Sequence, residues 1–275
     1  MKFPYLIAEI GSCFNTFKDC LNAIEVCADL GLSAVKFQYA TWETMFNQKH
    51  PSDEAYEFDK NFIDFQWIPE LSKKAHMVGL DFICSVFNED HFKDIYSYVD
   101  YYKIASIEAD DLNFACKVST FDKTPIISVG SLIIGQIDRI DYYFKKRPRV
   151  YLHSVVKYPA VDPKLPNFRY LKDRYCGLET GVGISDHMGG VYHLVGDPVL
   201  LQSIDVLEIH FNPFQIKNKP DTRHSIDTMQ MKELADAYLW KNDSIDYDVD
   251  GQNELAYKCK RVYDSKTGKT YRTFN

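Results

Sequence analysis

The 275-residue chain lacks a long apolar run, a surplus of basic residues and any closely spaced pair of cysteines. No segment approaches the roughly 20 consecutive apolar residues that a transmembrane helix needs. Glu9 interrupts the apolar stretch at residues 3–10, which predicts a strand rather than a signal peptide. The formal net charge of −7, from 32 Lys and Arg against 39 Asp and Glu, argues against a surface for nucleic acid. We therefore expect neither a membrane protein nor a nucleic-acid-binding protein.

The seven cysteines are scattered along the chain, and none forms a Cys-x-x-Cys pair. Cys20 and Cys27 are two helical turns apart and would share one face of a helix. This spacing is typical of small buried thiols, which indicates a reducing, cytoplasmic location. Hydrophobic residues make up 45% of the chain and aromatic residues 15%, enough for a substantial core.

Short apolar runs alternate with segments of helical periodicity. The strand-like runs lie at residues 5–10, 34–38, 81–85, 101–105, 124–128, 149–153, 181–185 and 206–211. The helix-like segments lie at residues 17–30, 62–78, 90–98, 112–119, 135–146, 166–174, 190–203 and 225–240. Eight strand–helix units fit a (β/α)8 TIM barrel, which usually takes ~250 residues. The alternative, an open doubly wound sheet, usually needs only about five or six strands.

The predicted barrel occupies residues 1–241, and the polar residues 242–275 form a short C-terminal appendage. Within this appendage, residues 261–263 and 269–272 flank a turn at 265–268 and resemble a small hairpin. Residues 39–58 form a long polar excursion, which predicts a loop that carries function or a binding contact.

Polar side chains gather at the predicted C-terminal ends of the strands, where a barrel places its chemistry. They are Glu9, Lys36, Gln38, Ser85, Lys103, Ser106, Glu108, Ser128, His153, Lys157, Tyr158, Ser185, Asp186, His187, Glu208 and His210. Lys36 and Lys103 stand inside apolar runs, where an ammonium group is costly to bury without an anion. With the neighbouring serines they predict a cradle for a phosphate or a carboxylate. The alternative is that these lysines snorkel at the rim or pair with Glu9 and Glu208.

His187 and His210 end the seventh and eighth predicted strands, which are neighbours in a barrel. Two neutral imidazoles could converge on one divalent cation such as manganese or zinc. Two histidines at strand ends can equally be structural. Glu9, Glu108 and Glu208 add carboxylates that could bind hydroxyls or move protons.

Several motifs follow one another in order along residues 5–240. They are IAEIGS at 7–12, AVKFQ at 34–38, YKIAS-x-E at 102–108, ISVGS at 127–131, Ser-Asp-His at 185–187, Glu-x-His-Phe at 208–211, Pro-Asp at 220–221 and His-Ser at 224–225. Together they resemble the barrel domain of the sialic acid synthases. The resemblance implies a transferase that forms a C–C bond between phosphoenolpyruvate and an N-acetylated amino sugar of the N-acetylmannosamine type. The products would be a nonulosonic (sialic-type) acid and phosphate.

The resemblance also implies roles for individual residues. His187 and His210 would hold a divalent metal, most often Mn²⁺, with Mg²⁺ or Co²⁺ as alternatives. Catalytic roles would fall on Glu9, Glu208 and Lys36. Substrate-binding roles would fall on Lys36, Gln38, Ser85, Lys103, Ser106, Glu108, Ser128, Tyr158, Ser185 and Asp221, of which Glu108 and Asp221 would contact the amino sugar.

The chain departs from the family pattern at several positions. Cys13 and Phe14 replace an Asn-His pair, Ile107 replaces a glycine, and Val156 replaces a polar residue. The family's small antifreeze-like C-terminal domain is not expected within this length, which leaves a homodimer or a separate polypeptide that supplies the domain as alternatives. Two other functions stay open: another metal-dependent aldolase or keto-acid synthase, and a non-catalytic barrel that binds a phosphorylated or sugar ligand.

Overall fold

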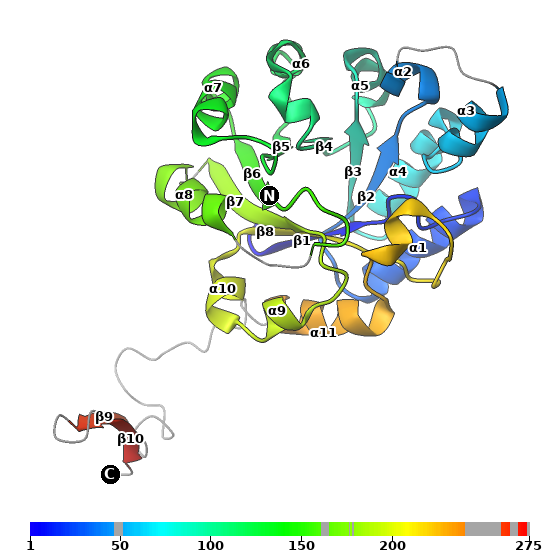
Figure 1. Ribbon diagram of the computed structural model, residues 1–275. Coiled ribbons are helices and arrows are strands. Elements are labelled where there is room, and N and C mark those ends of the chain that lie inside the picture. The colour runs from blue at the N-terminus through cyan, green and yellow to red at the C-terminus, as the bar shows by residue number, and fades with distance from the viewer. Residues whose placement is uncertain are drawn as a thin grey trace. The chain divides into compact units, whose positions relative to one another are not determined.

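A computed structural model describes residues 1–46, 52–160, 165–175, 177, 179–239, 260–264 and 269–273. The chain divides into two units, Met1–Tyr238 and Leu239–Asn275. In the first unit, eight strands close into a barrel in which each strand pairs with the next along the chain (Figure 1). All eight pairings are parallel, including that of β1 with β8. The predicted (β/α)8 TIM barrel is therefore confirmed.

The barrel strands agree with the predicted runs to within one residue at either end. They are β1 (Tyr5–Glu9), β2 (Ala34–Tyr39), β3 (Asp81–Val86), β4 (Tyr101–Ile104), β5 (Pro125–Ser128), β6 (Arg149–Ser154), β7 (Thr180–Asp186) and β8 (Val206–His210). This agreement follows from their composition, because each strand is a short, almost fully buried run.

Helices follow the strands around the barrel. They are α1 (Phe17–Asp29), α4 (Ile68–Met77), α5 (Glu89–Ile95), α6 (Leu112–Val118), α7 (Ile134–Phe144), α8 (Pro166–Tyr175), α9 (Tyr192–Val195), α10 (Pro198–Ser203) and α11 (Thr228–Leu239), with the 3-10 turns η1 (Phe65–Trp67), η2 (Glu108–Asp110) and η3 (Pro220–Arg223). Helix α1 begins with a capping box between Thr16 and Asp19. Cys20 and Cys27 lie on its buried face, as their spacing predicted.

Two predictions of secondary structure were wrong, one of a helix and one of a loop. Residues 190–203 form α9 and α10 rather than one helix, because Gly196 caps α9 and Pro198 starts a new helix that Asp197 caps. Residues 39–58 were expected to be a loop, but they contain α2 (Trp42–Phe46) and α3 (Ser52–Asp59). The rings of Trp42, Phe46 and Phe58 pack against one another in tilted and edge-to-face arrangements, with centroids 4.3 Å (Trp42–Phe46) and 5.3 Å (Phe46–Phe58) apart.

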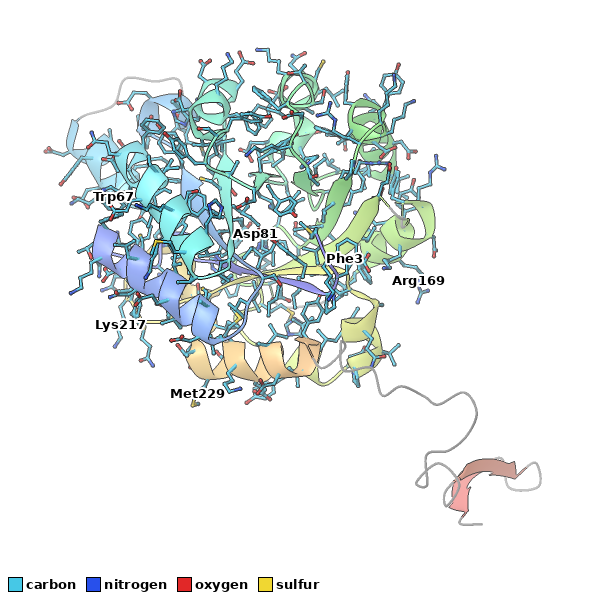
Figure 2. The ribbon with its side chains drawn as sticks, turned by 180° about the vertical axis from the view of Figure 1, so that it is seen from behind. Phe3, Trp67, Asp81, Arg169, Lys217 and Met229 are labelled. Atoms are coloured by element: carbon cyan, nitrogen blue, oxygen red, sulfur yellow. The ribbon has the colours of Figure 1, made fainter. Side chains whose placement is uncertain are left out.

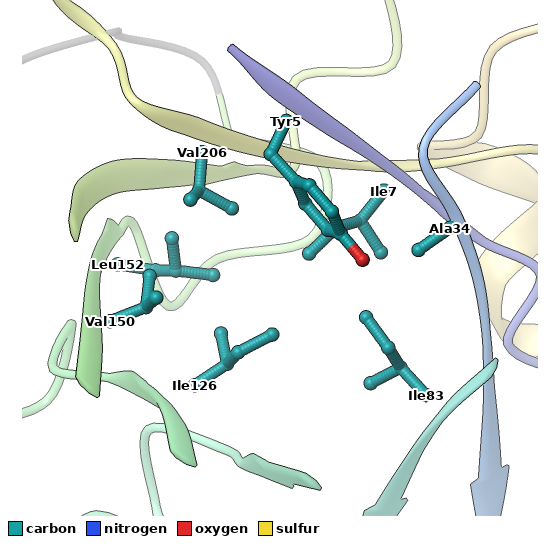
Figure 3. Close-up of a cluster of buried hydrophobic side chains, with 8 residues drawn as sticks. All are labelled: Tyr5, Ile7, Ala34, Ile83, Ile126, Val150, Leu152 and Val206. Atoms are coloured by element: carbon teal, nitrogen blue, oxygen red, sulfur yellow. The ribbon is translucent and has the colours of Figure 1, made fainter. Parts of the chain in front are cut away.

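The barrel interior is filled by a cluster of buried side chains (Figure 3). Its members are Tyr5, Ile7, Ala34, Ile83, Ile126, Val150, Leu152 and Val206. Two residues further along five of these strands stand Glu9, Lys36, Ser85, Ser128 and Glu208. Side chains two apart on a strand point the same way, so a polar layer lies directly on the apolar one, toward the C-terminal ends of the strands.

The outer helices cover the barrel and face solvent on their other side. Phe17 of α1 contacts Trp67 of η1, with ring centroids 5.4 Å apart, and both elements lie on the same side of the barrel in Figure 2. Met229 projects from α11 and is 80% exposed (Figure 2). No helix among the described residues is long and apolar enough to cross a membrane.

In the second unit, β9 (Lys260–Asp264) pairs antiparallel with β10 (Lys269–Thr273). These strands contain the two segments that the sequence predicted as a hairpin. Their sheet is separate from the barrel sheet.

Candidate active site

A cavity of about 400 Å³ opens at the C-terminal ends of the barrel strands. Its walls bring together every residue to which the resemblance gave a role except Glu9: Lys36, Gln38, Ser85, Lys103, Ser106, Glu108, Ser128, Tyr158, Ser185, His187, Glu208, His210 and Asp221. His153, Lys157 and Asp186, which also stand near the strand ends, do not line it. Glu9 is fully buried beside it and accepts a hydrogen bond of 2.6 Å from Nε2 of Gln38. The closed barrel therefore gathers residues that are up to 185 positions apart (Lys36 and Asp221) around one space.

Lys36 and Lys103 are both buried and both face carboxylates. Lys36 forms an ion pair with Glu9, and its Nζ lies 3.7 Å from Oε2 of Glu208 and donates to Oγ of Ser85 at 3.1 Å. Nζ of Lys103 lies 3.6 Å from Oε1 of Glu208. The pairing with Glu9 and Glu208, one of the alternatives drawn from the sequence, is therefore present, while both lysines also line the cavity.

The protonation of these groups is set by burial and by their neighbours. Burial raises the pKa of Glu9 above its ordinary value, although Lys36 acts in the opposite direction. Burial acts in the same sense on Glu208, but Lys103, Lys36 and a hydrogen bond of 2.8 Å from Ser185 together hold its pKa well below the usual range. Burial lowers the pKa of Lys103. A bound anion would stabilise the charged form of Lys103, so this layer favours an anionic ligand.

Serine hydroxyls also line the cavity. Oγ of Ser106 lies 2.9 Å from Oγ of Ser154 and accepts a hydrogen bond of 3.1 Å from the backbone N–H of Gly130. Oγ of Ser128 is buried with no hydrogen-bond partner within the described part of the chain. Ser154 was missed by the sequence analysis, which ended the sixth strand at residue 153, although Ser154 shares the inward column of Leu152.

His187 and His210 lie side by side, with ring centroids 5.4 Å apart. Nδ1 of His187 is 3.0 Å from the carbonyl oxygen of Val155, to which it donates, so Nε2 keeps its lone pair. Burial lowers the pKa of both imidazoles. They are therefore neutral near pH 7, which is the form that binds a divalent metal.

The turn η3 adds a second group of possible ligands beside His210. Donor atoms of His210, Asp221 and His224 lie within 4.8 Å of one another. Asp221 was expected to contact a sugar, whereas His224 was not assigned to the site. The only signal for His224 was its place in the motif after the eighth strand, three residues beyond Asp221.

Two glycines allow η3 to approach the barrel. Gly11 has a φ of +51°, and a Cβ atom there would lie 2.4 Å from Oδ2 of Asp221. Gly189 has a φ of +73°, and a Cβ atom there would lie 3.1 Å from Cα of His224. Both positions therefore need glycine for the close approach as well as for the backbone conformation.

The mouth of the cavity is apolar on one side. Ile107 and Val156, which replace a glycine and a polar residue of the family pattern, are 69% and 42% exposed and line the cavity with Met45 and Phe87. Glu108 also lines it, and burial raises the pKa of this carboxyl. A ligand that enters would thus meet apolar groups before it reaches the charged layer.

These features define a class: a (β/α)8 barrel with a buried, charged candidate active site at the C-terminal ends of its strands. The chain belongs to the NeuB family, whose model matches residues 23–244. The resemblance inferred from the motifs is therefore confirmed.

Two curated relatives and one solved structure are similar to this chain. The pseudaminic acid synthase of Campylobacter jejuni serotype O:2 is 25% identical over 259 residues, covering 86% of this chain and 73% of that one. The N,N'-diacetyllegionaminic acid synthase of the same strain is 25% identical over 256 residues, covering 86% and 75%. The crystal structure of an N-acetylneuraminic acid synthetase from Leptospira borgpetersenii, in complex with citrate, has a TM-score of 0.79 at 21% identity, covering 92% and 90%. The chain is a homologue of nonulosonic acid synthases, and the solved structure shows the shared fold.

Proposed function

We propose that this protein condenses phosphoenolpyruvate with an N-acetylated amino sugar to form a nonulosonic acid and inorganic phosphate, as a cytoplasmic enzyme of carbohydrate biosynthesis. The observation that carries this proposal is the buried polar layer, in which Lys36 and Lys103 meet serine hydroxyls at the floor of a 400 Å³ cavity. Phosphoenolpyruvate would bring about three negative charges to a protein whose net charge is −7, so its attraction must be local.

The charges of the floor suit such an anion. Burial raises the pKa of Glu9, which weakens its hold on the charge of Lys36 relative to an exposed carboxylate. Lys103 shares Glu208 with Lys36, at 3.6 Å and 3.7 Å. Two ammonium groups therefore face the cavity, and Ser128 offers a hydroxyl with no partner among the described residues. We assign the phosphate and the carboxylate of phosphoenolpyruvate to these groups.

The bond changes then follow. The vinyl carbon of phosphoenolpyruvate attacks the aldehyde carbon of the open-chain sugar, which forms the C–C bond and leaves a cation at the carbon that bears the phosphate. Glu208, ionised and held by Ser185 at 2.8 Å, stabilises this positive charge. The aldehyde oxygen becomes a hydroxyl by taking up a proton, and water adds to the cationic carbon with loss of a proton. The C–O bond to phosphate then breaks as the new hydroxyl loses its proton to become the keto group, which gives the keto acid and inorganic phosphate. Lys36 and Lys103 stabilise the departing phosphate.

The histidines fit a divalent cation, for which we propose Mn²⁺, with Mg²⁺ or Co²⁺ as alternatives. His187 presents an Nε2 lone pair, and Nδ1 of His210 is buried with no hydrogen-bond partner within the described residues. When bound, such a cation supplies Lewis acidity toward the sugar aldehyde. The residues that would hold it are His187 and His210.

The rim of the cavity supports an acceptor with several methyl groups. Ile107 and Val156 present exposed apolar surface at the mouth, where acetamido or deoxy-sugar methyl groups could pack. The names of the relatives, a pseudaminic and a diacetyllegionaminic acid synthase, agree with such an acceptor. Glu108 and Asp221 would contact the polar groups of the sugar.

The test is phosphate release from phosphoenolpyruvate by the full chain with Mn²⁺, with N-acetylmannosamine, diacetamido trideoxyhexoses and arabinose 5-phosphate offered in parallel. We expect release only with the N-acetylated sugars. Release with arabinose 5-phosphate alone would establish a different keto-acid synthase. Binding of phosphoenolpyruvate without release in any arm would establish a non-catalytic barrel.

A pair of lysine variants tests the floor itself. Lys103→Met should lower kcat/KM for phosphoenolpyruvate about 10- to 100-fold, because a hydrogen bond to a charged group contributes about 1.5–3 kcal/mol. Lys172→Met is the matched control, since Lys172 also pairs with a carboxylate, Asp205 at 3.0 Å, but does not line the cavity. Equal effects of the two variants would refute the assignment of Lys103.

A further inference from the structure

A second cavity, of about 730 Å³, opens beside the first one along the segment that joins β8 to η3. Tyr158, Pro220 and His224 line both cavities, so the two spaces are neighbours. The rings of Tyr158 and His224, with centroids 4.9 Å apart, lie at their boundary. The other residues that line this outer cavity are Ile216, Lys217, Asn218, Lys219, Thr222 and Arg223.

The outer cavity is basic. Lys217, Lys219 and Arg223 line it, and no carboxylate among the described residues does. These three side chains also form no ion pair within the described part of the chain, whereas exposed lysines elsewhere do. Lys60 pairs with Glu57 at 2.6 Å, for example. Three positive charges are therefore left for a ligand, in a chain whose net charge is −7.

The loop that carries these groups is held in a defined conformation. Buried Asn212 accepts from the backbone N–H of Ile216 at 2.8 Å and donates to the carbonyl oxygen of Ile216 at 2.9 Å. Gln215 and Asn218, on either side of Lys217, have φ values of +52° and +62°. Side-chain-bearing residues rarely adopt this left-handed conformation, and those that do gather at ligand sites.

Lys219 is partly buried in this loop. Its Nζ donates to the carbonyl oxygen of Lys60 at 3.1 Å. Burial and the charge of Lys60 both lower the pKa of Lys219. An anion in the outer cavity would stabilise its charged form, as it would for Lys103 at the floor.

We infer that Lys217, Lys219 and Arg223 form an outer binding site for a phosphate group. The planar guanidinium of Arg223 can donate two parallel hydrogen bonds to phosphate oxygens, and the two ammonium groups add charge. The inference rests on the proposed function for its ligands, because entering phosphoenolpyruvate and departing inorganic phosphate both carry this group. A site next to the catalytic cavity would concentrate either anion at the surface of an acidic protein.

The experiment measures anion binding by the full chain in the absence of sugar and divalent cations. The protein is titrated by calorimetry with phosphoenolpyruvate, inorganic phosphate and pyruvate, at low ionic strength, where exposed charges are least screened. We expect both phosphate-bearing ligands to bind at the outer site as well as at the floor, and pyruvate to bind at the floor alone. Tighter outer binding of phosphoenolpyruvate would assign the site to substrate entry, and tighter binding of inorganic phosphate to product exit.

Variants locate the outer site. Lys217→Gln combined with Arg223→Gln should weaken phosphate binding there at least about 10-fold, because two contacts to a charged group are lost. The matched control combines Lys145→Gln with Lys146→Gln, which removes two charges from exposed lysines that line neither cavity. This control changes the net charge by the same amount and should weaken binding much less. Equal weakening in the two double variants would overturn the inference.

Lys103→Met separates the outer site from the floor. It should weaken binding at the floor and leave outer binding unchanged, and melting curves show whether the barrel is intact. A single phosphate site that Lys103→Met removes and the Lys217/Arg223 double variant leaves intact would overturn the inference while the proposed function stands. Outer binding in a chain that releases no phosphate with any sugar would support the inference and refute the proposed function.

Discussion

Gly11 offers a direct test of how η3 is held against the barrel. A Cβ atom at Gly11 would lie 2.4 Å from Oδ2 of Asp221 and 3.3 Å from Oε1 of Glu9, and the residue has a φ of +51°. Gly11→Ala therefore combines an unfavourable backbone conformation with a collision. The collision falls on the carboxylate oxygen that accepts from Ser12 at 2.7 Å.

The two contributions can be given magnitudes. A left-handed conformation costs an alanine about 1–2 kcal/mol. Displacement of the Asp221 carboxylate by about 1 Å would break its charge-assisted hydrogen bond to Ser12, which contributes about 1.5–3 kcal/mol. The free energy of unfolding should therefore fall by about 2.5–5 kcal/mol in Gly11→Ala.

The matched control is Gly31→Ala. Gly31 has a φ of +68°, but a Cβ atom there would meet nothing within 4 Å, so the loss should be about 1–2 kcal/mol, from the backbone alone. Urea denaturation followed by circular dichroism measures both variants. In the double variant Gly11→Ala/Asp221→Ala, the loss in unfolding free energy should be smaller than the sum of the losses in the two single variants, because the carboxylate that collides with the new Cβ atom is absent. Equal losses in Gly11→Ala and Gly31→Ala, or additive losses in the double variant, would refute this account.

Three further outcomes are expected. The depressed pKa of Glu208 contributes stability that is present above about pH 4 and lost as the pH falls through the folded-state pKa. When the pH is lowered from 7 to 3, the melting temperature should therefore fall less in Glu208→Gln than in the parent. Parallel curves of melting temperature against pH would contradict the pairing of Glu208. Leu152→Ala in the barrel core should lower the free energy of unfolding by about 2–5 kcal/mol and Met229→Ala by less than about 0.5 kcal/mol, as measured in urea. Lys36→Met should destabilise by about 3–5 kcal/mol because it leaves buried carboxyls unpaired, and adding Glu9→Gln should recover part of this loss in the same assay; no recovery would show that the two residues are not coupled.

The strands could be predicted because their signal is local. Runs such as residues 34–38 and 81–85 are short, apolar and bounded by turns, and a parallel barrel buries both faces of each strand. The polar residues at their ends could be predicted for the same reason, since a closed barrel brings all C-terminal ends to one face. The gathering of Lys36, Lys103 and Glu208 is thus a consequence of topology.

What the sequence could not predict depends on contacts between distant segments. In α2, Trp42 and Phe46 have helical spacing, but they pack against Phe58 of α3, a contact between two short helices that residue order in this polar stretch does not reveal. His224 follows the last barrel strand, and its position depends on the close approach that Gly11 and Gly189 allow. Gly196 and Pro198 were visible in the sequence, and their effect on the helix at residues 190–203 should have been predicted.

The sequence alone also could not predict which groups pair with the two buried lysines at the bottom of the cavity. The lysines could have served a ligand or paired with carboxylates, and the structure shows both lysines paired and lining the cavity. The pKa values of the two carboxyls shift in opposite directions, because Glu9 is buried beside Lys36 alone whereas Glu208 lies between Lys36 and Lys103. This difference depends on which side chains are neighbours in space, which the order of residues in the sequence does not show.

On each of these strands, the core residue and the cavity residue point inward from the same face. This arrangement determines how the barrel tolerates insertions and deletions. In β2, Ala34 faces the core and Lys36 faces the cavity, while Val35 and Phe37 alternate with them. Loss of one residue ahead of Lys36 within β2 would exchange the two faces of the strand, burying a lysine against the outer helices and filling the cavity floor with Phe37. The same alternation of side chains therefore sets both the core packing and the lining of the cavity. We expect insertions and deletions within the strands to abolish folding or activity even at positions where single substitutions are tolerated.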